Sequence, residues 1–536
     1  MRILYSALLA MATAAATHAG KHGGEIRFQT SDRCIACHNE LTTPSGQDVS
    51  IGFDWRASIM ANSSRDPYWQ ASVRRETVDH PQQIEHIQDE CSVCHMPITR
   101  YLAKLQGKQG QIFPHLPFAD DKKQGREAAD GVDCSVCHQI SPEKLGTRES
   151  FNGGFVIEAP ALQGIHPEYG PFDLDPGQIR IMQTSTGGFQ PTKNTDQVKK
   201  SELCATCHTL YTTAFGPDGQ AIGSLPEQVP YQEWLKSDAY RNGQTCQDCH
   251  LTAVEEPVPI TRVFGVPREG MKRHVFVAAN FFMQRMLNRY RDDLEVDALP
   301  EELAHAADNT LSFLQQKSAR LSLEKMNLDG GRLQADVVVE NMGGHKLPTA
   351  YPSRRCWLHF SVRDRNGRVI FESGAVRPDG SIVGNDNDSD PARYEPHYTE
   401  ITGPDQVEIY EDILGDLQGR VTTGLLTGVR YLKDNRLLPA GFDKASADTD
   451  VMVVGGAVDD PNFEGGGHRV RYSVPTGGAP GPLQVEAELW YEPIGFRWAN
   501  NLKLYNRQPE PGRFTAFYDS MTHGYGTVLA RASVTF

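Results

Sequence analysis

The spacing of hydrophobic and polar positions changes near residue 320 and divides the chain into two regions. Before this point apolar residues recur at helical spacing, which predicts helices over 68–78, 276–290 and 300–320. After it apolar and polar residues alternate, which indicates strands. The expected strands cover 333–340, 356–363, 369–372, 450–454, 469–474, 483–491 and 527–536, with a hairpin turn at Asn366-Gly367. The pattern predicts an α+β multidomain protein: a mainly helical and loop-rich domain over 20–320, then a β-sandwich-like domain over 321–536. The alternative is an elaborated sheet that belongs to the first domain.

Residues 1–19 have the pattern of an export signal. Arg2 precedes an apolar stretch over 3–16, and small residues occupy the cut site, with cleavage expected after Ala19; Ala16 is the second choice. A membrane anchor is the weaker alternative, because a spanning helix needs about 20 apolar residues. No later apolar run has that length, so no transmembrane segment is expected after cleavage. The sequence predicts an exported protein, periplasmic first, with an extracellular or outer-surface location as the alternative.

The charge balance excludes one class of partner. The chain has 53 Lys and Arg against 68 Asp and Glu, which gives a formal net charge of −15. Nucleic-acid binding requires a basic surface that replaces the counterions of phosphate. We therefore expect no nucleic-acid partner.

Ten of the eleven cysteines lie in five copies of one pentapeptide, C-x-x-C-H. Cysteines of an exported protein usually form disulfides, but this spacing is typical of c-type haem attachment. The two thiols add to the two vinyl groups of haem, and the adjacent histidine coordinates the iron. We expect five covalently bound c-type haems in the 20–320 domain. The five motifs are, in order, Cys34 and Cys37 with His38, Cys91 and Cys94 with His95, Cys134 and Cys137 with His138, Cys204 and Cys207 with His208, and Cys246 and Cys249 with His250.

Two other interpretations of the motif are weaker. A zinc site does not explain a histidine directly after the second cysteine five times, and a thioredoxin-like dithiol occurs once, at a helix start after a strand. Cys356 lies outside the motifs and is expected to be a small buried residue.

Several further segments carry a resemblance to a known family. They are 55–61, 65–69, 246–250, 273–280, 344–349 with 353–355, and 433–439. In these segments the chain resembles the multihaem c-type cytochromes of the cytochrome c-554 type, with a C-terminal β-domain. The resemblance covers most of the chain. It implies electron transfer between closely packed haems, with two histidines on most irons.

The second axial ligand of each iron has to come from outside the motifs. In the family that the chain resembles, W-x-x-S-x-H-A presents such a histidine, and Met60 stands in its place here, which implies a His/Met haem of raised potential. A similar stretch over 234–240 has neither histidine nor methionine at that position. The other candidates are His80, His115, His274, His345 and His397. Six candidates for five positions mean that at least one is wrong.

These observations leave more than one function open. The leading hypothesis is an exported electron-transfer protein that passes electrons between redox partner proteins or other cytochromes. The alternative is a multihaem oxidoreductase that converts a small nitrogen or sulfur compound at one haem with an open coordination position. A subunit of a cytochrome filament, or another homo-oligomer, is a third interpretation. We favour electron transfer because the chain has so many candidate ligands.

Overall fold

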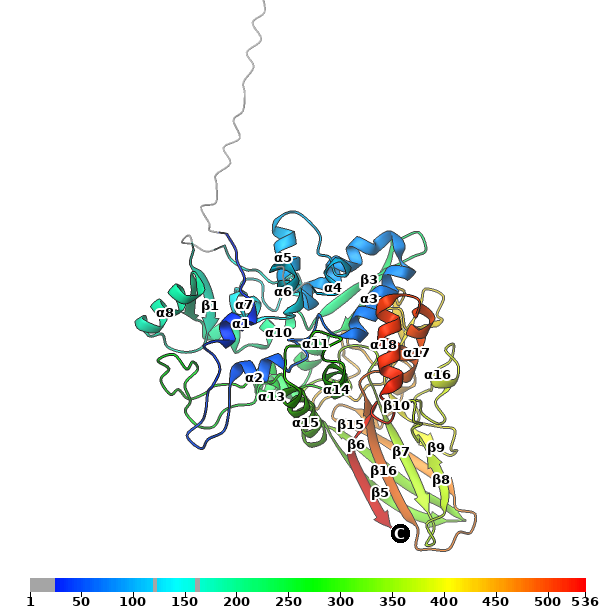
Figure 1. The fold of residues 1–536 in the computed structure, drawn as a ribbon. Coiled ribbons are helices and arrows are strands. Elements are labelled where there is room, and N and C mark those ends of the chain that lie inside the picture. The colour runs from blue at the N-terminus through cyan, green and yellow to red at the C-terminus, as the bar shows by residue number, and fades with distance from the viewer. Residues whose placement is uncertain (1–24, 119–122, 160–163) are drawn as a thin grey trace, which may run out of the picture.

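The computed structural model describes residues 25–118, 123–159 and 164–536, so the expected export signal lies outside the described residues. Helices and several sheets are both present, which confirms the α+β prediction. Most helices that precede residue 318 lie on one side of the molecule, and the long strands extend on the other (Figure 1). Within the described ranges, no helix is both long and apolar enough to cross a bilayer.

Helices in the first part of the chain are short and joined by long loops. They are α1 (Ser31–Ile35), α2 (Ile51–Arg56), α3 (Pro67–Asp79), α4 (Ile84–His95), α5 (Pro97–Leu105), α6 (Lys123–Ala129), α7 (Cys134–Gln139), α8 (Pro176–Thr186), α9 (Thr195–Val198), α10 (Ser201–Ala205), α11 (Pro230–Leu235), α12 (Asp238–Arg241), α13 (Cys246–His250), α14 (Phe281–Arg289) and α15 (Pro300–Lys317). Two small sheets accompany them: β1 (His166–Gly170) pairs with β2 (Phe189–Lys193), and β3 (Leu210–Phe215) pairs with β4 (Ala221–Gln228).

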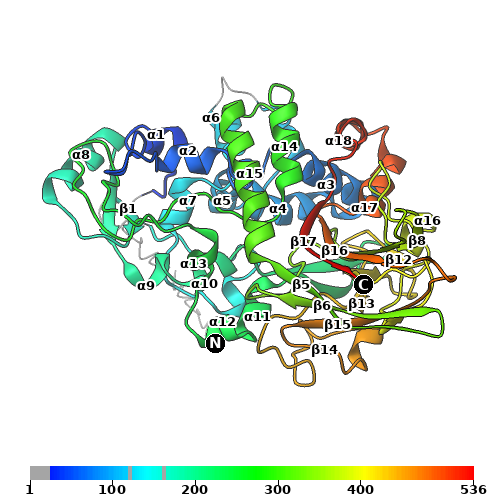
Figure 2. The same ribbon diagram turned by 90° about the horizontal axis from the view of Figure 1, so that it is seen from below.

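The predicted helices are present with shifted ends. The helix expected over 68–78 is α3, where Pro67 occupies the first turn and the Asp66 carboxylate accepts two backbone N–H groups. The helix expected from 276 begins only at Phe281, because Phe276 has a φ of 44° and Asn280 caps the helix. The helix expected to 320 ends at Lys317, where the chain turns into a strand. Figure 2 shows α14 and α15 side by side.

Two five-stranded sheets form most of the second part. One has the order β10 (Ile409–Tyr410), β7 (Arg355–Arg363), β16 (Gln484–Glu492), β17 (Thr527–Thr535), with β8 (Val369–Ser373) paired to β7. The other has the order β14 (Phe463–Glu464), β15 (Gly467–Pro475), β6 (Arg332–Asn341), β5 (Ala319–Asp329), with β9 (Glu400–Ile401) paired to β15. A third, three-stranded sheet has the order β12 (Val421–Thr422), β11 (Asp412–Gly415), β13 (Arg430–Asp434).

All the expected strands except one are present. The hairpin predicted at Asn366-Gly367 joins β7 and β8, and Gly367 has the positive φ that this turn requires. The strand expected over 450–454 does not form. Within this range only Val454 pairs, in an isolated bridge to Asp434.

The two large sheets bury a common core. Phe360 of β7 stacks on Tyr472 of β15 with ring centroids 4.0 Å apart, so side chains of the two sheets interdigitate. Cys356 lies on β7 and is fully buried, as expected for a small apolar residue.

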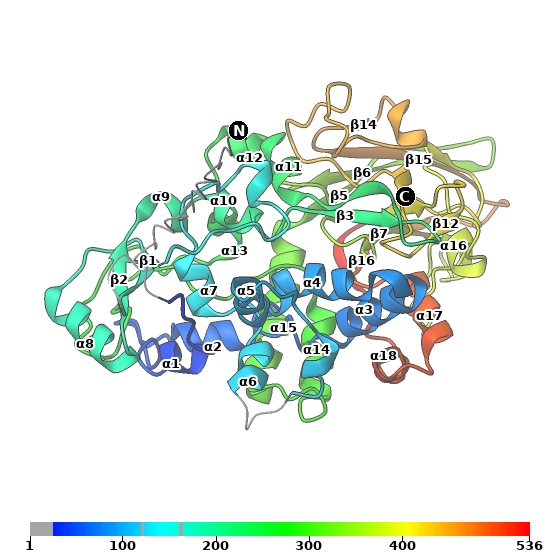
Figure 3. The same ribbon diagram turned by 90° about the horizontal axis from the view of Figure 1, so that it is seen from above.

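The end of the chain returns to the helical part. Helices α17 (Phe496–Leu502) and α18 (Pro509–Ser520) lie beside α3 (Figure 3). Arg74 of α3 binds both carboxylate oxygens of Glu510, at 2.7 and 2.9 Å. Residues from both sides of position 320 thus contribute to one apolar core. The division into domains at residue 320 stays a prediction.

Candidate functional site

Each of the five C-x-x-C-H motifs has its first cysteine on a helix. These cysteines lie in α1, α4, α7, α10 and α13, and all ten motif thiols are free of disulfides. In α4, α7 and α13 the helix also covers the second cysteine and the histidine, so one helical turn presents the two thiols and the histidine together. Caps fix two of these helix starts: the Asp133 carboxylate accepts the Val136 N–H at 2.7 Å, and Thr245 and Asp248 form a capping box.

The first motif runs past the end of its helix. Helix α1 ends one residue before Ala36, so Cys37 and His38 lie in the turn that follows it rather than on the helix itself. Backbone bonds still close this turn, because the carbonyl of Cys34 accepts the N–H of Cys37 at 3.1 Å and that of His38 at 3.0 Å. The carbonyl of Cys37 in turn accepts the N–H of Arg262 at 2.9 Å. The main chain from Cys34 to His38 thus stays in a closed turn although the helix has ended.

The fourth motif ends its helix in the same way, and the fifth is the most open to solvent. Helix α10 ends at Ala205, and the carbonyl of Cys204 accepts the N–H of Cys207 at 3.2 Å and that of His208 at 2.9 Å. Among the ten motif cysteines Cys249 is exposed, whereas the other nine are partly buried. The edge of a haem at the fifth motif would therefore lie closest to solvent.

Four of the five motif histidines direct Nδ1 to a backbone carbonyl of another segment. His38 faces the oxygen of Ile260 at 2.6 Å, and His95 faces that of Ser63 at 2.9 Å. The remaining contacts join His138 to the carbonyl of Tyr169 and His250 to that of Val277, both at 2.6 Å. A carbonyl only accepts, so Nδ1 carries the proton and Nε2 keeps its lone pair for a metal.

Burial keeps several of these imidazoles neutral. It lowers the pKa of His95, His250 and His274 to about 4, and it lowers the pKa values of His38, His138 and His208 as well. Neutral imidazole is the form that binds a metal.

Two motif histidines face a second histidine. The ring centroids of His138 and His274 lie 6.3 Å apart with a 24° angle between the planes, and those of His250 and His345 lie 6.2 Å apart with an 8° angle. Both partners also direct Nδ1 to a carbonyl: His274 to that of Lys272 at 3.2 Å, His345 to that of Lys346 at 2.9 Å. We call these two sets the carbonyl-anchored pairs.

The separation within these pairs fits an iron between two imidazoles. A ligating nitrogen lies about 2 Å from a metal and about 1 Å from the centre of its own ring. Two imidazoles on opposite sides of one metal therefore have centroids about 6 Å apart. Together with the free thiols beside His138 and His250, the residues present fit covalent haem with two histidine ligands.

An ion pair holds the segment that carries His274. Arg273 binds both oxygens of Asp54 in α2, at 2.8 and 2.6 Å, and the Asp54 side chain is 1% exposed. A bidentate guanidinium–carboxylate pair fixes direction as well as distance. The residue before His274 is thus tied to α2.

The loop that carries His345 is held by a buried ionic cage, which consists of Glu233, Lys346, Asp434 and Arg436. Lys346 places Nζ 2.7 Å from Asp434, and Arg436 contacts Asp434 at 2.8 Å and Glu233 at 3.0 Å. Glu233 also accepts the backbone N–H of Lys346 at 3.1 Å. All four side chains are at most 6% exposed, so each charge depends on its partners.

Thiols of different motifs are neighbours. The pKa of Cys34 is raised first by its interaction with the Cys134 thiol, that of Cys204 by Cys246, and that of Cys207 by Cys94. The first motif therefore adjoins the third, and the fourth adjoins both the second and the fifth. Cys137 of the third motif lies near Cys204 and Cys207 of the fourth, so these contacts join all five sites into one group.

The other predicted ligands have different surroundings. His80 lies 3.2 Å from the hydroxyl of Thr427, and His115 lies partly buried in a short helical turn. The carbonyl of Met60 accepts the N–H of Val132, two residues before the third motif, at 3.0 Å. Among the described residues, no ring contact joins these side chains, or His397, to a motif histidine. His397 instead contacts carboxylates in the β region.

Three motif histidines, His38, His95 and His208, have no facing histidine ring in the part of the chain that the structure describes. Trp69 stacks on His95 with centroids 4.3 Å apart and planes 2° apart. Near the second motif, burial and the neighbouring Glu90 and Glu76 raise the pKa of Glu227 to about 8. An acid that titrates near neutral pH therefore lies close to Cys91.

Sequence reasoning missed the groups that orient the histidines. The carbonyls belong to residues of no particular type, so no side-chain signal marks them. The Asp54–Arg273 pair and the cage had a partial signal, because Arg273, Lys346 and Arg436 lie in segments that carry the family resemblance.

Comparisons with known proteins give one structural neighbour. No family model matches the chain, and no curated protein matches it. The fold is similar to that of a penta-haem cytochrome c552 from Thermochromatium tepidum, with a TM-score of 0.51 and 15% sequence identity, over 95% of this chain and 99% of that one. At this identity the likeness shows the fold alone.

Proposed function

We propose that the protein is an exported pentahaem c-type cytochrome that transfers electrons between redox partners. The proposal rests on two pairs of facing imidazoles, His138 with His274 and His250 with His345. Their ring centroids lie 6.3 and 6.2 Å apart. Haem iron with two imidazole ligands takes up and releases one electron.

The haems would be attached through thioether bonds to the motif thiols. Each motif offers two free thiols within one turn of chain, followed directly by a histidine. The attachment residues that we propose are Cys34, Cys37, Cys91, Cys94, Cys134, Cys137, Cys204, Cys207, Cys246 and Cys249.

The distal ligands that we propose first are His274 and His345. Each lies opposite a motif histidine, and each belongs to a segment that a buried ion pair or cage holds in place. Fixed imidazoles keep a site the same in both oxidation states, so little reorganisation accompanies the gain of charge. Met60, His80 and His115 stay proposals for the remaining positions, and His397 is no longer among them.

The neighbouring thiols support an order for the haems. The thiol contacts form two groups: motif one with motif three, and motif four with motifs two and five. Cys137 of the third motif lies near Cys204 and Cys207 of the fourth, and this contact joins the two groups. We propose the connected order one, three, four, with two and five both next to four. The donor and acceptor are redox proteins or other cytochromes, and a filament or other homo-oligomer remains compatible with this order.

One observation favours a second candidate function. The motif histidine His95 has no facing histidine among the described residues, and Glu227, with its raised pKa, lies near the same motif. An iron with an open position beside a proton donor is what an oxidoreductase for a small nitrogen or sulfur compound needs. Under this alternative the second motif holds the catalytic haem.

Electron paramagnetic resonance of the oxidised holoprotein separates the two functions. Electron transfer alone predicts five low-spin irons and no change of spectrum on addition of nitrite or sulfite. One stoichiometric high-spin iron that responds to such a compound would instead favour the oxidoreductase. Pyridine haemochrome analysis gives the number of haems, and fewer than five per chain would contradict the proposal itself.

A further inference from the structure

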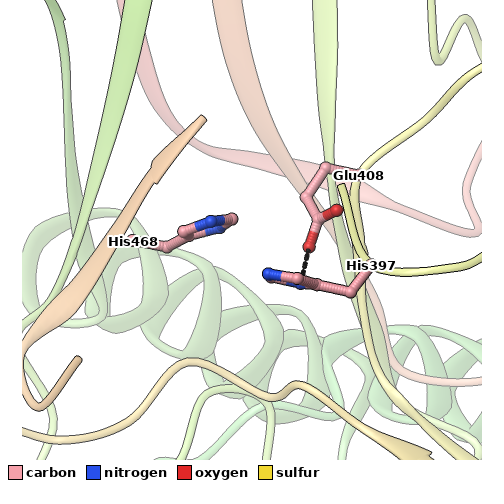
Figure 4. Close-up of side chains that lie close together, drawn as sticks. All are labelled: His397, Glu408 and His468. Carbon is pink, nitrogen blue, oxygen red and sulfur yellow. Dashed lines mark ion pairs between the residues drawn. The ribbon is translucent and has the colours of Figure 1, made fainter. Parts of the chain in front are cut away.

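A second cluster of buried histidines lies in the β region, away from the five motifs. His397, Glu408, Asp460 and His468 have side chains that are at most 1% exposed. Figure 4 shows Glu408 and the two imidazoles close together. Glu408 immediately precedes β10, whereas His468 belongs to β15, so the cluster lies between the two large sheets.

The donor atoms of this cluster converge. One oxygen of Asp460 lies 3.0 Å from Nε2 of His397 and 2.9 Å from Nε2 of His468. Glu408 lies 2.8 Å from Nδ1 of His397, and atoms of His397, Glu408 and His468 all lie within 4.8 Å of one another. Ligands of one tetrahedral metal ion are separated by about 3–3.5 Å, so small side-chain shifts suffice to admit an ion.

Groups around the cluster hold it in place. Tyr410 places its hydroxyl 3.0 Å from Nδ1 of His468, and Asn435 donates to Glu408 at 2.8 Å. The backbone N–H of Tyr398 donates to the other oxygen of Glu408 at 2.6 Å. Such partners on the far ring nitrogen and on the carboxylate are typical of metal sites, where they fix the tautomer and the ring direction.

We propose that His397, Glu408 and His468 bind a divalent transition-metal ion of the zinc class, with Asp460 beside both imidazoles. Two imidazoles with carboxylates suit zinc and its neighbours, whereas calcium takes six to eight oxygen ligands. Burial of the whole set indicates a closed, structural site rather than a catalytic one. The site is independent of the haem function proposed above.

The bound ion joins elements that are far apart in the chain. It ties the segment before β9 and the segment before β10 to β15, and thereby links the two sheets. Asn435, which contacts both Glu408 and His397, lies between Asp434 and Arg436 of the ionic cage. Loss of the ion is therefore expected to destabilise the end of β13, where Asp434 and the ionic cage hold the loop that carries His345.

The alternative is a cluster held by protons alone. His397 donates to Glu408 and Asp460, His468 donates to Asp460, and Tyr410 donates to His468, so every nitrogen has a partner without an ion. Metal analysis separates the two, because this network contains no metal.

The test uses full-length holoprotein purified without chelators or an affinity metal. Elemental analysis is expected to find about one zinc-class ion per chain besides the haem iron. X-ray absorption at the metal edge should then give a shell of nitrogen and oxygen with imidazole scattering and no sulfur. Less than one tenth of an equivalent, in protein that also takes up none from added Zn²⁺, would overturn the proposal. A sulfur shell would overturn it too, because the ion would then sit on motif cysteines.

Variants locate the ion. His468→Gln is expected to reduce the bound metal at least tenfold while haem content stays at the wild-type level. The matched control is His359→Gln, because His359 also lies between two carboxylates, Glu372 and Glu488, but has no second imidazole. Equal metal content in both variants would contradict the assignment, and the wild-type measurement decides if His468→Gln fails to fold.

Discussion

Two sets of paired histidines lie in this molecule, and they differ in what anchors them. In the carbonyl-anchored pairs, each ring directs Nδ1 to a neutral backbone oxygen. In the β region, His397 and His468 contact carboxylates instead. Haem brings a doubly negative porphyrin that already balances ferrous iron, so neutral anchors suffice. A bare divalent ion has no such balance, and carboxylates among its ligands supply the compensating negative charge in a buried site. The charge of the anchors thus indicates which kind of metal a buried pair can hold.

Removal of a distal ligand gives the largest expected effect. If the protein binds five haems as proposed, His274→Ala would leave the iron of the third motif with one protein ligand, so one iron in five should become high-spin and bind carbon monoxide. Electron paramagnetic resonance and carbon monoxide difference spectra measure this. His397→Ala should leave all five irons unchanged, and the exposed His523→Ala is the control. The comparison of the two sets fails if His397→Ala also converts one iron.

The next largest effect is expected at the ionic cage. Its member Lys346 follows His345, and Asn435, which lies between Asp434 and Arg436, contacts His397. Asp434→Asn leaves Lys346 and Arg436 under-compensated, and loss of one partner of a buried pair costs about 3–5 kcal/mol of unfolding free energy. Denaturant unfolding measures this loss. Asp519→Asn, which breaks an exposed pair with Lys503, should cost less than about 1 kcal/mol. If Asp434→Asn lowers the free energy of unfolding as little as the control does, the cage does not stabilise the fold.

The free energy of unfolding should change with pH in opposite directions for Asp434 in the ionic cage and for Glu227 near the second motif. Burial alone would raise the pKa of Asp434, but Arg436 and Lys346 outweigh it and hold this pKa at about 2. A lowered pKa stabilises the fold above the ordinary pKa, and this contribution is lost as the pH falls toward 2. Glu227 has its pKa raised to about 8, so its contribution is present below its ordinary pKa and is lost as the pH rises through 8.

Glu227→Gln tests the alkaline side. The variant should be more stable than the wild type at pH 8–9, by about 1–3 kcal/mol, because no buried charge forms there. Thermal unfolding between pH 5 and 9 measures the difference. The groups near Glu227 that titrate or carry charge are Glu76, Glu90, Cys91, Tyr351 and Tyr431. A wild type and variant with parallel pH profiles would assign the pH dependence to those groups instead.

The smallest effect is expected at Met60. If its thioether binds an iron, Met60→His replaces it by imidazole and lowers the potential of one haem, since thioether ligation raises it. Redox titration of all five haems checks this. A titration that overlays that of the wild type would make Met60 a packing residue.

Sequence patterns predicted the framework better than the site. The five motifs, α3 and the β6–β8 strands follow from spacing and periodicity, which are local properties. The helix expected from 276 begins only at Phe281, and the carbonyl of Val277 before it contacts His250, which no local pattern encodes. The candidates His274 and His345 lie in segments that carry the family resemblance. No local pattern shows that His397 lies beside Glu408, Asp460 and His468, because only the pairing of distant strands brings these residues together.

The carbonyl contacts of the motif histidines have a consequence for how such a chain can evolve. Every amino acid has a backbone carbonyl, so Ile260, Ser63, Tyr169 and Val277 can be exchanged for other residues without loss of the hydrogen bond. Selection then acts on the path of the main chain at these positions rather than on residue identity. Lineages can drift apart in sequence around an unchanged metal geometry, with only the cysteines and the histidines as fixed points.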